Sequence, residues 1–126
     1  MNLLLNGDLT EQKALLWYAV CMRYAFIRDF AIEVVQNKFV AMDLFLSESD
    51  YYAFVGRKAL DHPELEDLKP STSRKAYTVL FRMMREAGIL SEQQTIVPMT
   101  LSRRLIEALV EDDPDALRVF PTYNLA

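Results

Sequence analysis

Three kinds of residue are scarce in this sequence of 126 residues, which has one cysteine, one histidine and three glycines. The single cysteine, Cys21, leaves no intrachain disulfide to form and suits a reducing compartment. The one histidine, His62, has no partners at the spacing of a zinc site or a Ser-His-Asp triad. Three glycines cannot build a glycine-rich phosphate loop. We therefore expect no catalytic residues, no metal and no cofactor.

Long hydrophobic runs are also missing. The longest run, from Ala14 to Met22, has nine residues, whereas a membrane-spanning helix needs about twenty. The apolar start, from Met1 to Leu5, has no basic residue before it and so lacks the layout of a secretory signal. With 52% hydrophobic and 25% charged residues, the composition is that of a globular domain. We expect a cytoplasmic protein without a membrane span, folded as a single helical domain over residues 1–126.

The sequence predicts a series of helices whose ends are marked by particular residues. Asp8 and Glu11 have the spacing of a capping box. The helix that follows is apolar nearly all the way round, so we expect it to be the central helix of the core, enclosed by the others. In the second helix, Phe39 should face inward and Gln36 should face water. Helices are expected over about 9–24, 27–42, 47–58, 71–88 and 102–110, with short turns after Pro63 and Pro114. Ser47 should open the third of these helices and Ser102 should cap the last.

Two helix boundaries are less sharply defined by the pattern. No glycine or proline marks the joint between the first two helices, so a separate second helix and a continuation of the first both fit. The fourth helix is expected to follow Pro70, with Ser71 or Ser73 as its N-cap. The core helices are expected at about 9–42.

The fourth helix carries basic residues on one face and ends at a glycine. At one hundred degrees per residue, Arg74, Thr78, Arg82 and Arg85 share roughly a quarter of its circumference. The predicted buried face is formed by Ala76, Leu80, Met83, Met84 and Ala87. Gly88 supplies a left-handed residue, after which 89–91 and 95–97 could pair as a hairpin. This order is typical of a winged helix-turn-helix, here at about 47–110, within an otherwise all-α, mostly helical protein.

Charge is distributed unevenly along the chain. Between Lys69 and Arg104 there are seven Lys or Arg residues against two acidic residues, a balance of +5. Because the whole chain has a net charge of −4, the remainder carries −9. A basic segment on an acidic protein attracts and orients a polyanion, which favours double-stranded DNA as the partner. The candidate DNA-binding residues are Arg74, Lys75, Thr78, Arg82, Arg85, Arg103 and Arg104.

Two other interpretations of the basic helix remain open. Arginines on an outer helix face are often only solvated, with no ligand. Alternatively, the protein is an interaction adaptor, in which this helix docks on an acidic partner with Phe81 as the apolar anchor. Phe81 projects beside the basic stripe, and packing on a neighbouring helix explains it as well. A small metal-independent hydrolase has only scattered carboxylates in its favour.

Several segments resemble one protein family. They are 16–21 (LWYAVC), 26–31 (FIRDFA), 62–65 (HPEL), 80–88 (LFRMMREAG) and 120–121 (FP). Their order along the chain resembles the BrxA family of the bacterial BREX phage-defence systems. The resemblance implies an all-helical DNA-binding protein without catalytic activity, acting beside the other BREX proteins. Family members are longer, with a helical region ahead of this part, so the chain resembles a shortened member or a C-terminal portion.

The resemblance does not supply the site residues. The basic residues proposed above follow from helix geometry and local charge alone. The exposed stripe lacks Asn and Gln side chains, which read base edges, so we expect contacts to phosphates and a weak sequence preference. The sequence does not indicate an oligomeric state.

Overall fold

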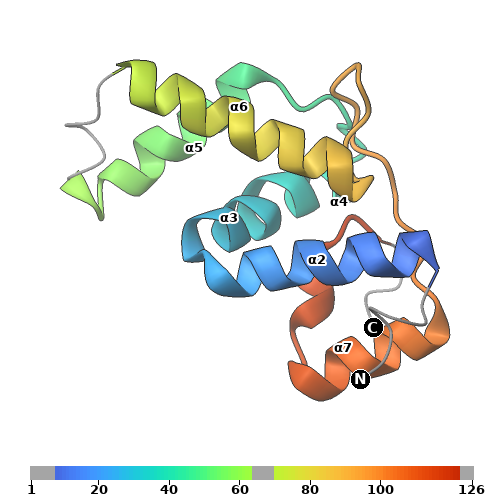
Figure 1. The fold of residues 1–126 in the computed structure, drawn as a ribbon. Helices are drawn as coiled ribbons and strands as arrows, with labels where there is room; N and C mark the ends of the chain where they lie inside the picture. Colours follow the sequence, from blue (N-terminus) through green and yellow to red (C-terminus); the bar gives the residue numbers. More distant parts are fainter. Residues whose placement is uncertain (1–7, 64–69, 123–126) are drawn as a thin grey trace.

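The computed structural model describes residues 8–63 and 70–122, and the regular structure in this part of the chain is almost entirely helical (Figure 1). The all-α prediction is therefore confirmed. In chain order the elements are α2 (Leu9–Arg23), α3 (Ala25–Phe30), the π-helix η1 (Ala31–Gln36), α4 (Asn37–Val40), α5 (Glu48–Ala59), α6 (Pro70–Ala87), α7 (Arg103–Asp112) and the 3-10 helix η3 (Ala116–Val119). Helix α2 lies in the middle, with α3 and α6 on one side and α7 on the other.

Helix α2 begins with the predicted capping box. The Glu11 amide donates to the Asp8 carboxylate at 2.8 Å, and the Asp8 amide donates to the Glu11 carboxylate at 3.0 Å. Trp17 and Cys21 are buried, as expected of a core helix. The enclosure predicted for α2 is wrong, however, because the Leu16 side chain is 59% exposed. One apolar side of α2 therefore faces outward.

The chain breaks between α2 and the next helical segment. Tyr24 has extended backbone angles, with φ −124° and ψ 104°, so the second segment is separate from the first. It runs from α3 through η1 into α4, and Phe39 is buried as predicted. The prediction that Gln36 faces water is wrong, since its side chain is buried and, among the described residues, neither of its side-chain polar atoms has a hydrogen-bond partner. A π-turn has more residues than an α-turn, so η1 rotates the residues that follow it.

Aromatic rings hold α3, α5 and α6 together. The rings of Phe30 and Phe54 meet edge to face, with centroids 5.3 Å apart, and Tyr77 and Phe81 of α6 lie 4.4 Å from each other. Tyr51 of α5 contacts both of these α6 rings. Such pairs bury large apolar areas and prefer these tilted geometries. The cluster fixes how α6 sits on the rest of the core.

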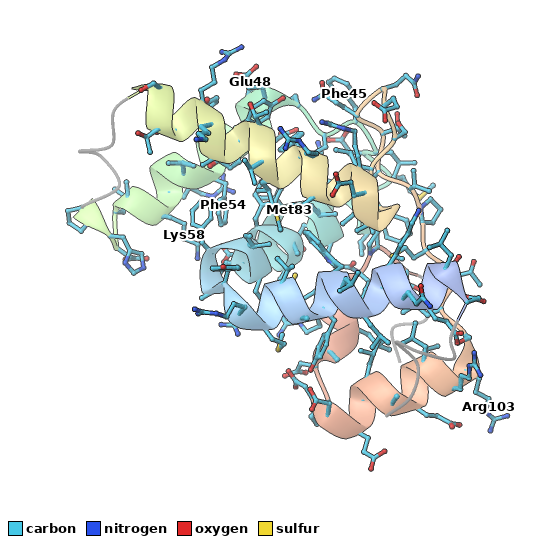
Figure 2. The ribbon with its side chains drawn as sticks, viewed as in Figure 1. Phe45, Glu48, Phe54, Lys58, Met83 and Arg103 are labelled. Atoms are coloured by element: carbon cyan, nitrogen blue, oxygen red, sulfur yellow. The ribbon has the colours of Figure 1, made fainter. Side chains whose placement is uncertain are left out.

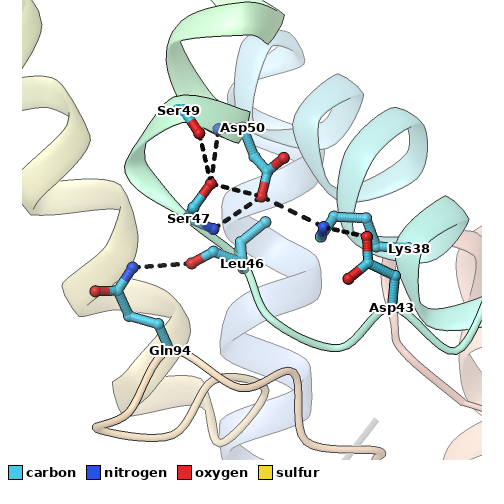
Figure 3. A network of polar contacts seen from close by, with 7 residues as sticks. All are labelled: Lys38, Asp43, Leu46, Ser47, Ser49, Asp50 and Gln94. Atoms are coloured by element: carbon cyan, nitrogen blue, oxygen red, sulfur yellow. Dashed lines mark hydrogen bonds and ion pairs between the residues drawn. The ribbon is translucent and has the colours of Figure 1, made fainter.

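A polar network connects the loop before α5 to its neighbours (Figure 3). Ser47 forms the predicted N-cap of α5, accepting from the Asp50 amide at 3.1 Å. The Lys38 ammonium lies 2.8 Å from Asp43 and 3.4 Å from Asp50. Gln94 donates from its side chain to the Leu46 carbonyl at 2.8 Å. These contacts tie the end of α4, the start of α5 and the loop after α6 to one another.

The predicted hairpin after α6 is present only as isolated bridges. Leu90 pairs antiparallel with Ile96, and Phe45 pairs with Thr95 on the other side. The Val97 amide donates to the Ile89 carbonyl at 2.9 Å. Between residues 70 and 122 no named strand forms. The structure therefore does not establish the wing of a winged helix.

Helix α6 starts earlier than predicted. Its first residue is Pro70, because proline is compatible with the first turn of a helix, where its missing amide has no partner to lose. Its end is as predicted, with Gly88 at φ +84°. The turn predicted after Pro63 lies outside the described residues.

The C-terminal part packs beneath α2. Ser102 is the N-cap of α7, accepting from the Leu105 amide at 3.3 Å, as the sequence indicated. The indole of Trp17 donates to the Val119 carbonyl of η3 at 2.8 Å. The Tyr18 hydroxyl donates to the Asp112 carboxylate at 2.5 Å. Helix α2 is thus hydrogen-bonded to both helical elements of this part.

Candidate nucleic-acid interface

The outer face of α6 carries most of the predicted DNA-binding residues. Arg74, Lys75, Thr78 and Arg82 are exposed, and Arg85 is half-buried. Along a helix, residues separated by three, four or seven positions share one side. The structure therefore places these five residues on one continuous surface, which we call the α6 basic face.

The cations of this face differ in their internal partners. Arg74 lies 3.6 Å from Glu48, and Arg85 lies 3.9 Å from Glu92, both near the outer limit of an ion pair. Thr78 donates its hydroxyl to the Arg74 carbonyl at 3.0 Å. In the part of the chain that the structure describes, Lys75 and Arg82 make no ion pair. Among the described residues, the face therefore has two cations without an ion pair, Lys75 and Arg82, and two in long ion pairs, Arg74 and Arg85.

The prediction that Arg103 and Arg104 flank the basic helix is wrong. Both residues belong to α7, which lies on the far side of α2 from α6, and Figure 2 shows Arg103 at the outer end of α7. Arg103 lies 3.1 Å from Glu107, one turn further along the same helix. Nearness in the sequence misled the prediction, because the loop between α6 and α7 carries the chain around α2.

Arg104 instead forms part of an internal network around Glu11. Its guanidinium donates to both Glu11 carboxylate oxygens, at 2.5 and 2.8 Å, and the Ser102 hydroxyl donates at 2.5 Å. The Glu11 side chain is buried. Hydrogen bonds from Arg104, then from Ser102 and the Asp8 amide, lower the pKa of Glu11 to about 2. This charge-assisted network joins α2 to α7 and pairs the Arg104 charge with an internal carboxylate.

Phe81 cannot be the exposed anchor of the adaptor hypothesis. Its ring is 1% exposed and lies in the aromatic cluster, against Phe30, Tyr51 and Tyr77. The other interpretation, that Phe81 packs on a neighbouring helix, is confirmed. The buried face of α6 is rotated from the predicted one, with Ala76 exposed and Phe81 inside.

An apolar groove on the inner side of α6 was not predicted from the sequence. It consists of two pockets of about 240 and 260 Å³ that share Met83: the first lies between α2 and α6, and the second lies between α6 and the start of α3, with Tyr51 of α5. We call it the groove between α2 and α6. Met83 is labelled in Figure 2, on the side of α6 toward α2 and α3. The available sequence signal was the apolar circumference of α2, which exceeds what the core covers. Besides Met83, the residues that line the first pocket are Lys13, Leu16, Trp17, Val20, Glu86 and Ala87, and those that line the second are Tyr24, Phe26, Ile27, Tyr51, Ala76, Val79 and Leu80.

The described residues offer little for other chemistry. Burial raises the pKa of the Cys21 thiol to about 12, which keeps it protonated and unreactive. Across residues 8–63 and 70–122, no three His, Cys, Asp or Glu side chains gather as a metal site would require. In the same part of the chain, no helix combines the length and apolar character needed to cross a bilayer.

A helical fold with a cationic helix face defines a class of proteins rather than one family. Comparison with known families narrows it, because residues 1–113 match the model of the BrxA family. The chain therefore belongs to the BrxA family.

One curated relative is named BREX protein BrxA, from Bacillus cereus strain H3081.97. It is 28% identical to this chain over 89 residues, which cover 71% of this chain and 44% of the relative. The chain thus aligns with less than half of that relative's length. No solved structure matches the chain.

Proposed function

We propose that this chain is a double-stranded DNA-binding, non-catalytic component of a bacterial BREX phage-defence system, acting in the cytoplasm. In this proposal α6 and the loop 89–97 contact DNA in a winged-helix-like manner. Family membership supports the BREX assignment. The α6 basic face supports the DNA assignment.

The observation that carries the DNA proposal is the pair of cations Lys75 and Arg82. They are exposed, separated by two helical turns, and without an acidic partner in the described part of the chain. Counterion release from the DNA drives binding whenever such cations neutralise phosphates. A pair of this kind can form these contacts without first breaking an internal bond.

Arg74 and Arg85 can also contact DNA, because little free energy is lost when their internal ion pairs break. Their ion pairs with Glu48 and Glu92 are long, and exposed pairs of this kind contribute only about 0–1 kcal/mol. A phosphate can therefore replace either acid. The described face has no Asn or Gln between Arg74 and Arg85, so binding should depend on phosphates with weak preference among sequences.

The test is a titration of labelled duplex DNA by fluorescence anisotropy. Lys75→Glu/Arg82→Glu should weaken binding at least about tenfold, since it replaces two attractions by two repulsions. The matched control is Arg103→Glu/Arg118→Glu, which changes net charge equally at α7 and η3 and should have a much smaller effect. With two to four phosphates neutralised, log affinity should fall against log salt with a slope of about −2 to −4. Equal losses for both double variants would reject the interface.

A second candidate function is a protein-interaction adaptor within the BREX assembly. Phe81 no longer supports it, because that ring is buried. The apolar groove between α2 and α6 does, because exposed apolar surface that runs between two helices is typical of a site for a protein partner.

A further inference from the structure

We propose that the groove between α2 and α6 binds an amphipathic helix with acidic flanks, contributed by a partner protein. This inference rests on the adaptor function and specifies its partner. The apolar floor of the groove offers nothing to a phosphate, whereas Lys75 and Arg82 at its rim belong to the α6 basic face as well, so Leu16→Glu and Val79→Glu within the groove separate the two functions.

The exposed apolar side chains lie along both walls of the groove. Leu16 is 59% exposed and Tyr24 is 51% exposed on the α2 side, while Val79 of α6 is 40% exposed. Met83 lies between them as the residue common to both pockets. Large apolar side chains usually occur singly on a protein surface, so their alignment along one groove points to a partner.

The length of the groove suits a helix. Lys13 of α2 lines one end and Tyr24, the residue directly after α2, lines the other, eleven positions further along the chain. At 1.5 Å per residue this corresponds to roughly 16 Å, or three turns of a docked helix. A helix of that length presents apolar residues at positions i, i+3, i+4 and i+7 to such a groove.

The rims of the groove are mainly cationic. On the α2 side, Lys13 lines the groove and the Arg23 guanidinium lies 5.3 Å from the centre of the Tyr24 ring. On the α6 side, Lys75 and Arg82 lie four positions before and three after Val79, on the same side of the helix. Lys13 and Glu86 are the two charged residues that line the pockets, so the cationic excess comes from Arg23, Lys75 and Arg82 beside them. Charge complementarity therefore selects a partner with acidic residues beside its apolar stripe.

The same charges argue against a second copy of this chain as the occupant. In a two-fold dimer the same patch is present on both partners. Pairing the groove with itself would place the cationic rims of the two copies close together, and like charges facing each other across an interface are unfavourable. An acidic helix removes this repulsion.

Two synthetic peptides test the proposal. Both are about 15 residues long, which covers the groove, and carry the same leucine stripe, but one has Glu and the other Lys at the flanking positions. We expect the Glu peptide to bind the full chain at least tenfold more tightly than the Lys peptide, measured by fluorescence anisotropy. Equal affinity would overturn the acidic specificity but keep the adaptor function, and binding of neither peptide would reject both.

Variants locate the binding site. Leu16→Glu should weaken binding of the Glu peptide at least tenfold, and Val79→Glu, on the opposite wall of the groove, should weaken it by a similar factor. Leu60→Glu is the matched control, because Leu60 is exposed and lies outside the groove. Circular dichroism checks that each variant folds, and DNA affinity of Leu16→Glu checks that the α6 basic face is intact. Unchanged peptide binding by Leu16→Glu and Val79→Glu, or a dimer that Leu16→Glu dissociates, would overturn the proposal.

Discussion

Helices α6 and α7 both carry arginines, but the two helices are attached to the protein in different ways. Helix α6 is held by aromatic rings, chiefly Tyr77 and Phe81, while its two cross-element ion pairs are long. Helix α7 is held by a polar network in which Arg104 and Ser102 donate to Glu11. An arginine already paired with an internal carboxylate attracts a phosphate less than an unpaired one does. Apolar attachment therefore leaves the cations of α6 available, whereas polar attachment engages Arg104 of α7.

The strongest way to break the α6 attachment is Phe81→Ala. Phe81 is buried among rings from three helices, and a buried Phe→Ala change lowers the free energy of unfolding by about 3–5 kcal/mol. Chemical denaturation measures this loss. The control Phe45→Ala removes the same atoms from a side chain that is 57% exposed, and its effect should stay below about 1 kcal/mol. Similar losses for both variants would show that the aromatic cluster does not hold α6.

The α7 attachment is broken by Glu11→Gln, with a smaller but pH-dependent effect. The pKa of Glu11 is lowered from 4.5 to about 2, so its charge stabilises the folded state above pH 4.5. That stabilisation is lost as the pH falls from 4.5 toward 2. We expect Glu11→Gln to lower the melting temperature at pH 7, and the difference from the unmodified protein to narrow across this range.

An exposed acid on α7 provides the control for that experiment. Glu107 pairs with Arg103 on the surface of one helix, where salt bridges contribute little. Glu107→Gln should therefore leave the melting temperature nearly unchanged at every pH. A constant difference between Glu11→Gln and the unmodified protein from pH 7 to pH 2 would mean that its effect does not come from the carboxylate charge.

The smallest effect is expected from Tyr18→Phe. This change removes the hydroxyl that donates to Asp112 and keeps the buried ring. A hydrogen bond to a charged group contributes about 1.5–3 kcal/mol, but Asp112 can accept from water instead, so the loss should fall at the low end of this range. Thermal denaturation measures it. A larger loss than that of Glu11→Gln would place the main link between α2 and α7 at Tyr18.

Local signals in the sequence predicted helix ends well. Capping residues such as Asp8, Ser47 and Ser102, and the stop at Gly88, act within one turn and so can be identified without the fold. Gln36 was misplaced because the π-turn in η1 changes the helical period, and no residue type marks such a turn.

Long-range partners could not be predicted. Arg104 meets Glu11 across 93 positions of sequence, so its removal from the candidate site depends on the fold. On α6 the apolar residues form two neighbouring arcs, and periodicity alone does not tell which arc faces the core. The structure assigns Phe81 to the core and Val79 to the groove, whereas Lys75 and Arg82 are exposed, as helix geometry indicated.

The position of Trp17 has a practical consequence. It is the only tryptophan of the chain, it bonds to Val119 of η3, and it also lines the groove beside Leu16. Its fluorescence emission therefore comes from one known place, where the docking of the C-terminal part and the occupancy of the groove both change the surroundings of the indole. The protein thus contains an intrinsic optical probe that needs no attached dye.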